Sequence, residues 1–248
     1  MKIFQFLPDV TGRFIVGAPE NYMVAKAGVP EWYKKSERFY TSDMKSPDEI
    51  AESDKEEFGG LKTCVPFLDA MIHGYFYTTR EDIYVNTTKE NIVEIYAVQP
   101  DGTKIQESEM IGRRDPKSGA LIPRPAGHAH EHLIWRNNLG FKTPRGYSTL
   151  LTHPLNRYDL PFTTMSGIID SDKWQNPGNI PFFFKENIET IIPKGTPIVQ
   201  LIPIKRNKWK HVVDNSYFVE KMYQDGVDVR SVKSGWYRDK FWIRKDFD

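Results

Sequence analysis

The chain has 248 residues, of which 39% are hydrophobic and 27% are charged, so it can fold around a full core. Its 34 basic and 33 acidic side chains nearly cancel, which excludes a long-range field that would gather nucleic acid or an anionic membrane. We therefore expect neither a membrane nor a nucleic-acid partner. An aromatic content of 13%, with 17 Gly and 17 Pro, favours a turn-rich, mostly β fold.

Cys64 is the single cysteine, which excludes an intramolecular disulfide and a cysteine-based zinc site and is consistent with a reducing compartment. Its apolar neighbours predict a buried, unreactive thiol. The first residues contain no apolar stretch of signal-peptide length, and no run approaches the roughly 20 apolar residues of a membrane span. The sequence thus predicts a soluble, cytoplasmic protein.

The first 60 residues predict a strand and a helical arm. Residues 3–6 indicate the strand, which a loop broken by Pro and Gly follows. A short helix is expected at 30–35, where a proline precedes an acid. Residues 41–60 are polar and acidic and predict a solvated segment, with a further helical turn at 46–49.

The segment from residue 61 onward is more apolar and predicts the β core, over 61–210. Pro66 starts a short buried helix that Gly74 ends. Strands are predicted at 75–77, 82–85 and 92–98. Residues 107–126 carry two proline-centred breaks and little periodicity, so they predict a long loop.

The C-terminal part, 211–248, predicts a helix at 217–224 and then a tail that alternates aromatic and basic residues at 233–245. Such a tail can stack on bases and contact phosphates, or pack onto the core or a neighbouring subunit; packing is favoured because aromatic side chains dominate cores and interfaces. No linker divides the chain, so 1–248 is predicted to be one domain.

Two apolar runs predict the centre of the fold. The run at 165–169 ends in Asp170 and Asp172, and the run at 197–202 contains Gln200. Both predict strands, and we expect them to be neighbours in one barrel-like or sandwich domain. Gln200 must find partners there, because an unpaired buried amide costs about 1–3 kcal/mol. A carboxylate held at a strand end is suited to aim at a water, as general-base chemistry requires.

The turn Gly-Ile-Ile-Asp-Ser-Asp at 167–172 and the strand Lys-Gly-Thr-Pro-Ile-Val-Gln-Leu-Ile at 194–202 resemble paired motifs of the dUTPase-like (β-clip) superfamily. The resemblance covers roughly 143–206 and implies a single β-barrel or jelly-roll-like domain. In that family the first acid of the turn positions and activates the hydrolytic water, and the Gln strand helps to hold the phosphates. By position, these roles fall on Asp170 and Gln200.

The segment Pro-Arg-Gly-Tyr-Ser at 144–148 is similar to the phosphate loop of the same family. The resemblance therefore implies that Tyr147, Ser148 and Asp172 join Gln200 in binding substrate. It also implies a nucleotide ligand, diphosphate hydrolysis and Mg²⁺ as cofactor. The alternative is that the two acids only close a turn and that Gln200 only pairs with backbone.

A broader resemblance, to an uncharacterised family of phages and marine viral sequences, spans 61–210. It rests on phrases such as TPRGYSTLLTHPLNR, PFTTMSGIID and NPGNIPFFF. It implies a host-cell cytoplasmic or virion location and no particular activity. The rival interpretation is therefore a structural, assembly or interaction protein without catalysis. In either case we expect a homo-oligomer that pairs through exposed strand edges.

The sequence His-Ala-His-Glu-His places His128, His130 and His132 at alternate positions. On a strand, the three imidazoles would project from one face and could bind Zn²⁺ or Fe²⁺, an arrangement similar to that of cupins. A polar surface edge with neutral histidines is the alternative.

Overall fold

The computed structural model describes residues 2–7, 21–41, 57–119, 121–137, 140–175, 178–213, 219–231 and 235–247. Of these residues, 38% lie in strands and 19% in helices, which confirms the predicted mostly β class. The chain divides into two compact units, one made of Met1–Gly28 with Gly74–Arg206 and the other of Val29–His73 with Asn207–Asp248. No helix in the described ranges is long and apolar enough to cross a bilayer.

The first unit contains a five-stranded antiparallel sheet in the order β14-β12-β17-β5-β2. Its strands are β2 (Tyr22–Val24), β5 (Tyr75–Thr78), β12 (Tyr147–Thr152), β14 (Gly167–Ile169) and β17 (Pro197–Lys205). The side chains of β17 are buried from Pro197 to Ile202, so both faces of this strand are covered, as its continuous apolar run predicts.

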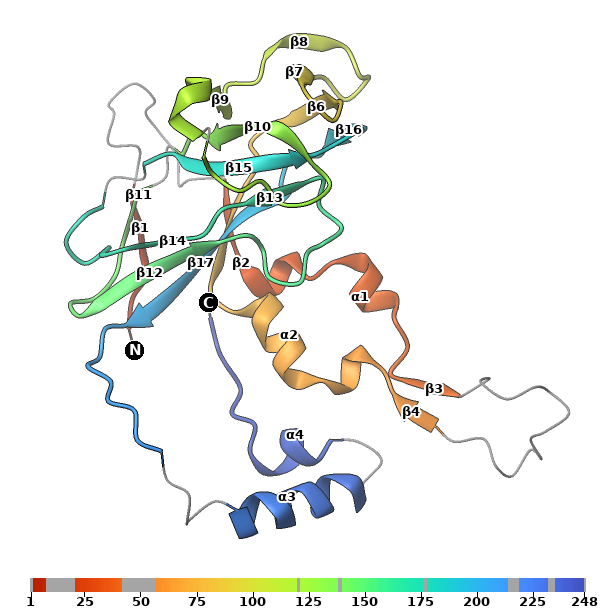
Figure 1. Ribbon diagram of the computed structural model, residues 1–248, viewed down its shortest axis with the longest axis vertical. Coiled ribbons are helices and arrows are strands. Elements are labelled where there is room, and N and C mark those ends of the chain that lie inside the picture. Colours follow the sequence, from red (N-terminus) through yellow and green to blue (C-terminus); the bar gives the residue numbers. More distant parts are fainter. Residues whose placement is uncertain are drawn as a thin grey trace, which may run out of the picture. The chain divides into compact units, whose positions relative to one another are not determined.

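A four-stranded antiparallel sheet in the same unit has the order β13-β15-β10-β9 (Figure 1). Its strands are β9 (Ile111–Arg113), β10 (His128–Trp135), β13 (Phe162–Thr164) and β15 (Ile180–Lys185). The remaining elements of the unit are β1 (Gln5–Leu7), η1 (Ala25–Gly28), β6 (Asp82–Thr87), β7 (Ile92–Val98), β8 (Lys104–Glu107), η5 (Pro116–Gly119), β11 (Gly140–Lys142) and β16 (Glu189–Ile192). The sheets formed by these strands are open, so the predicted barrel is not closed.

An aromatic cluster on the four-stranded sheet belongs to the buried core. The Trp135 ring is fully buried and stacks on Phe182 with 3.9 Å between centroids, and Phe162 meets it edge-on. The indole N–H donates to the Thr164 hydroxyl, which donates in turn to the carbonyl of Ile198 in β17. The cluster thus joins the two sheets without leaving its polar groups unpaired.

The strands that carry Asp170 and Gln200 are not neighbours, contrary to the prediction. Strand β12 lies between β14 and β17 (Figure 1). Strand β14 is the edge of its sheet, and Ile168 in its middle is 64% exposed, so the apolar run before Asp170 is not a buried strand. Apolar composition alone cannot separate an edge strand from a central one, because pairing partners come from distant parts of the chain.

Other predicted elements are formed, with two differences. Strand β9 lies inside the predicted loop 107–126, because β10 offers an edge with which a short segment can pair. Cys64, at the N-cap of helix α2 (Val65–Ile72), is exposed rather than buried. The helical turn predicted at 46–49 lies outside the described residues.

The second unit is mainly helical. It contains α1 (Glu31–Lys35), β3 (Phe39–Thr41), β4 (Glu57–Gly59), η4 (Leu61–Thr63), α2, α3 (Val219–Ser231) and α4 (Trp236–Lys240). The C-terminal tail is held to α2 through Asp69, whose Oδ2 accepts hydrogen bonds from the Trp242 indole at 2.8 Å and the Lys245 ammonium at 2.7 Å. Part of the aromatic and basic tail therefore packs against its own chain.

Candidate functional site

The polar residues predicted at the strand ends gather around one arginine. Tyr147 begins β12 opposite Lys205 of β17, while Thr149 lies opposite Ile169 of β14. The start of β12 therefore lies beside the ends of two antiparallel neighbours, and the side chains that follow those ends meet there. We call Ser148, Asp170, Asp172 and Arg206, with the carbonyl of Tyr147, the strand-end cluster.

Asp170 is the exposed acid of the strand-end cluster, with 54% of its side chain accessible. Its Oδ1 accepts a hydrogen bond from the Ser148 hydroxyl at 2.6 Å and another from Arg206 Nη1 at 3.1 Å. The Ser148 hydrogen bond, with the Arg206 charge as a further cause, lowers the pKa of this carboxyl below its ordinary value. Oδ2 receives no hydrogen bond from the described residues.

Asp172 is the buried acid of the cluster, with 5% of its side chain accessible. Its Oδ2 accepts hydrogen bonds from Arg206 Nη2 and, at 2.8 Å, from the backbone N–H of Gly146. These two donors, the arginine first, lower the pKa of Asp172 to about 2. Gly146 has a φ of +86°, a conformation that favours glycine and that points its amide at the carboxylate.

Arg206 ties the cluster together. Its Nη1 donates to the Tyr147 carbonyl and to the Ser148 hydroxyl, at 3.1 and 2.9 Å, while Nη2 is held by Asp172. The tyrosine contributes its carbonyl, and its ring is covered by the Lys2 ammonium, 4.4 Å from the ring centroid. Arg206 was not predicted as a site residue, although its place directly after the strand with the longest buried run was an available signal.

Gln200 does not belong to the strand-end cluster. It pairs with Thr152 at the far end of β12, six residues along β17 from Arg206, which corresponds to roughly 20 Å at 3.3 Å per residue. Its side chain is fully buried, and Oε1 accepts the backbone N–H of Leu155 at 2.8 Å. The amide therefore satisfies a backbone donor, as the alternative interpretation of its role proposed.

The three predicted metal-binding histidines are not on one face. An irregularity in the pairing of β10 between His128 and His132 breaks the alternation on which the prediction depended. His128 is buried, with Nδ1 facing the Ala126 carbonyl at 3.0 Å and Nε2 facing the Thr163 hydroxyl at 2.8 Å. Both of its ring nitrogens are therefore occupied by protein oxygens.

His130 and His132 instead line a cavity of about 670 Å³. The other residues that line it come from the β6–β7 turn, the loop around η5 and β10: Glu90, Asn91, Arg114, Gly119, Ile122, Arg124 and Glu131. Among the described residues no three His, Cys, Asp or Glu side chains are placed to hold a metal ion. The predicted three-histidine metal site is thus not formed.

No family model matches the chain, and no curated protein sequence matches it significantly. The function is therefore inferred from the geometry of this protein together with the motif resemblance described above.

Proposed function

We propose that the protein binds a nucleotide at the strand-end cluster, within a fold of the dUTPase-like (β-clip) kind. The supporting observation is that Tyr147, Ser148, Asp170 and Asp172, which the family resemblance assigns to one site, converge on Arg206 from β12 and from the turn after β14. An arginine at an accessible strand end, held by carboxylates, is suited to bind phosphate, because its planar fork matches phosphate oxygens.

The two acids have different tasks in this proposal. Asp172 is almost inaccessible and holds Nη2, so it fixes the direction of the guanidinium. Asp170 is half exposed, and an exposed ion pair is weak because water competes with it. A nucleotide phosphate carries more charge than a carboxylate and can therefore replace Asp170 at Arg206 while Asp172 keeps the arginine in position.

Displacement by the phosphate leaves the Asp170 carboxylate free beside the ligand. An aspartate carboxyl with its ordinary pKa is already ionised at neutral pH, so it can orient a water for attack on the diphosphate bond. Mg²⁺, which usually binds through one or two carboxylates and the substrate's phosphates, would take its protein ligand from Asp170 Oδ2. When bound, the ion would neutralise phosphate charge.

The test is an assay of pyrophosphate release from each deoxynucleoside triphosphate with Mg²⁺, comparing the wild type with Asp170→Asn. The proposal expects turnover in the wild type and its loss in the variant, with nucleotide binding retained. Absence of turnover together with absence of any thermal shift for every nucleotide would remove the enzyme hypothesis.

A structural or assembly role is the second candidate, and the edge strand β14 favours it. This strand has an unpaired edge among the described strands, with Ile168 64% exposed, and Trp174 in the following turn is 60% exposed. Exposed apolar edges pair readily with a second copy. Light scattering after size exclusion should then show a homo-oligomer that Ile168→Lys dissociates; a monomeric wild type would contradict this candidate.

A further inference from the structure

The cavity lined by His130 and His132 lies on a different sheet from the strand-end cluster, and the proposed function does not use it. Its floor is β10, and its walls come from the β6–β7 turn and the loop from Arg114 to Arg124. A volume of about 670 Å³ falls within the range of small-molecule sites.

His132 is the buried polar group of this cavity. The residue is 6% exposed, and its ring nitrogens make no hydrogen bond with any described residue. Phe183 lies beside the imidazole, and a side chain on Gly119 would meet it, since a Cβ there would lie 2.0 Å from Cε1 of the ring. The ring nitrogens of His132 are not among the buried polar atoms that lack a partner, so they are open to the space of the cavity and can hydrogen-bond a ligand there.

The charges around the cavity favour an anion. Arg114 makes no ion pair or hydrogen bond with the described residues, and Arg124 uses only Nη1, on backbone carbonyls. Glu131 is neutralised by Arg113, which holds both of its carboxylate oxygens at 2.9 and 3.1 Å. Glu90 is then the one acid lining the cavity without an ion partner among the described residues, against two available guanidinium groups.

We propose that this cavity binds a small molecule bearing a phosphate or a carboxylate group. Arg114 and the free nitrogens of Arg124 hold the oxyanion, and His132 donates a hydrogen bond to an acceptor of the same ligand. Ile122 supplies an apolar wall for the rest of the molecule. A metal ion does not fit this site, because two guanidinium groups repel a cation and offer it no lone pair.

The test uses inorganic phosphate and succinate as probes, with chloride at equal ionic strength as control. Both probes are titrated into the full chain and followed by calorimetry and by the imidazole signals in NMR spectra. At least one probe should bind, and the signals of His132 should shift on binding. Arg114→Gln should weaken binding at least tenfold, since a hydrogen bond to a charged group is lost.

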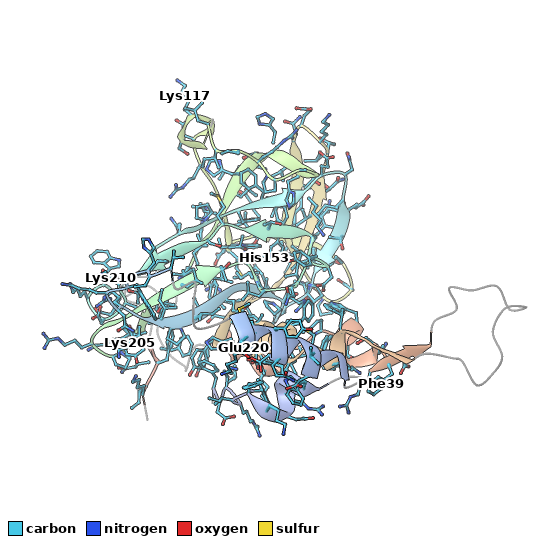
Figure 2. The ribbon with its side chains drawn as sticks, turned by 60° about the horizontal axis from the view of Figure 1, so that its bottom comes forward. Phe39, Lys117, His153, Lys205, Lys210 and Glu220 are labelled. Atoms are coloured by element: carbon cyan, nitrogen blue, oxygen red, sulfur yellow. The ribbon has the colours of Figure 1, made fainter. Side chains whose placement is uncertain are left out.

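Lys117→Gln is the matched control. It removes one positive charge from η5, in the same loop, but Lys117 is exposed and extends away from the loop (Figure 2), and it does not line the cavity. Its affinity for the probe should equal that of the wild type. Gly119→Ala should weaken binding too, because the added methyl group must displace the His132 ring.

Three results would overturn the proposal: binding of neither probe beyond the chloride control, equal losses in Arg114→Gln and Lys117→Gln, or binding abolished by Arg206→Gln but unaffected by Arg114→Gln. The last result would place the anion at the strand-end cluster and leave the proposed function standing. Conversely, loss of nucleotide turnover in Asp170→Asn tests the strand-end cluster without touching this cavity. Comparison of the two probes separates phosphate from carboxylate ligands.

Discussion

The strand-end cluster and the histidine-lined cavity differ in whether their polar side chains already have hydrogen-bond partners in the protein. In the cluster, Arg206 is bonded to two carboxylates, a hydroxyl and a carbonyl, so an incoming anion must replace a bond that already exists. In the cavity, Arg114 and His132 make no hydrogen bond with the described residues, so a ligand there has to displace water but no protein partner. An anion can therefore bind at the strand-end cluster only by replacing a protein group at Arg206. In the cavity, an anion can bind without displacing a protein group.

The largest expected effect comes from Asp170→Asn in the cluster. If this acid orients water, its amide should lower kcat for nucleotide hydrolysis roughly 100-fold. Without Mg²⁺, nucleotide affinity should rise at the same time, because the neutral side chain competes less well for Arg206. Steady-state kinetics measures the expected fall in kcat, and calorimetry with the same nucleotide measures the expected rise in affinity. A fall in affinity would show that Asp170 does not compete with the phosphate.

Gly119→Ala tests the histidine-lined cavity, because it adds a methyl group against the His132 ring. The new Cβ would lie 2.0 Å from the His132 ring, so the imidazole or the loop must move. Forcing extra atoms into a packed site typically costs about 1–3 kcal/mol of unfolding free energy. Urea denaturation should show a loss of this size, with nucleotide hydrolysis unchanged. An unchanged midpoint would mean that the loop does not rest on His132.

The stability of the cluster should depend on pH through Asp172. Its pKa of about 2 in the folded chain lies below the value of about 3.9 expected in the unfolded chain. The stabilisation is therefore complete above about pH 4 and is lost as the pH falls through 2. Thermal unfolding of the wild type and Asp172→Asn should differ most at pH 5 and converge near pH 2. A constant difference across this range would contradict the assigned ion pair.

The smallest effect on stability is expected from Arg113→Gln beside the cavity. The Arg113 side chain is 46% exposed, and exposed ion pairs contribute less than about 1 kcal/mol, so chemical denaturation should barely change. Anion affinity in the cavity should nevertheless fall severalfold, because Glu131 would face the ligand uncompensated. A severalfold gain would imply that Glu131 does not face the bound anion.

Hydrophobic periodicity and turn residues predicted the strands and the acids at a strand end, because both depend on residues close together in the sequence. The buried run 197–202 and its need to satisfy Gln200 were both predicted correctly. The order of strands was not, since it depends on pairings between distant segments, and β12 came between the two motifs. Histidine spacing failed for a related reason: one irregularity in β10 changed which side chains share a face.

The most direct test of the strand-end cluster is calorimetric titration of deoxynucleoside triphosphates into the wild type, Arg206→Gln and Lys205→Gln. Lys205 is the matched control, because it is the cation that ends β17 directly before Arg206 and the cluster's ion pairs are made by Arg206. We expect at least one nucleotide to bind the wild type and Lys205→Gln equally, and Arg206→Gln at least tenfold more weakly. No nucleotide binding to the wild type, or equal binding to Arg206→Gln, would contradict a phosphate site at Arg206.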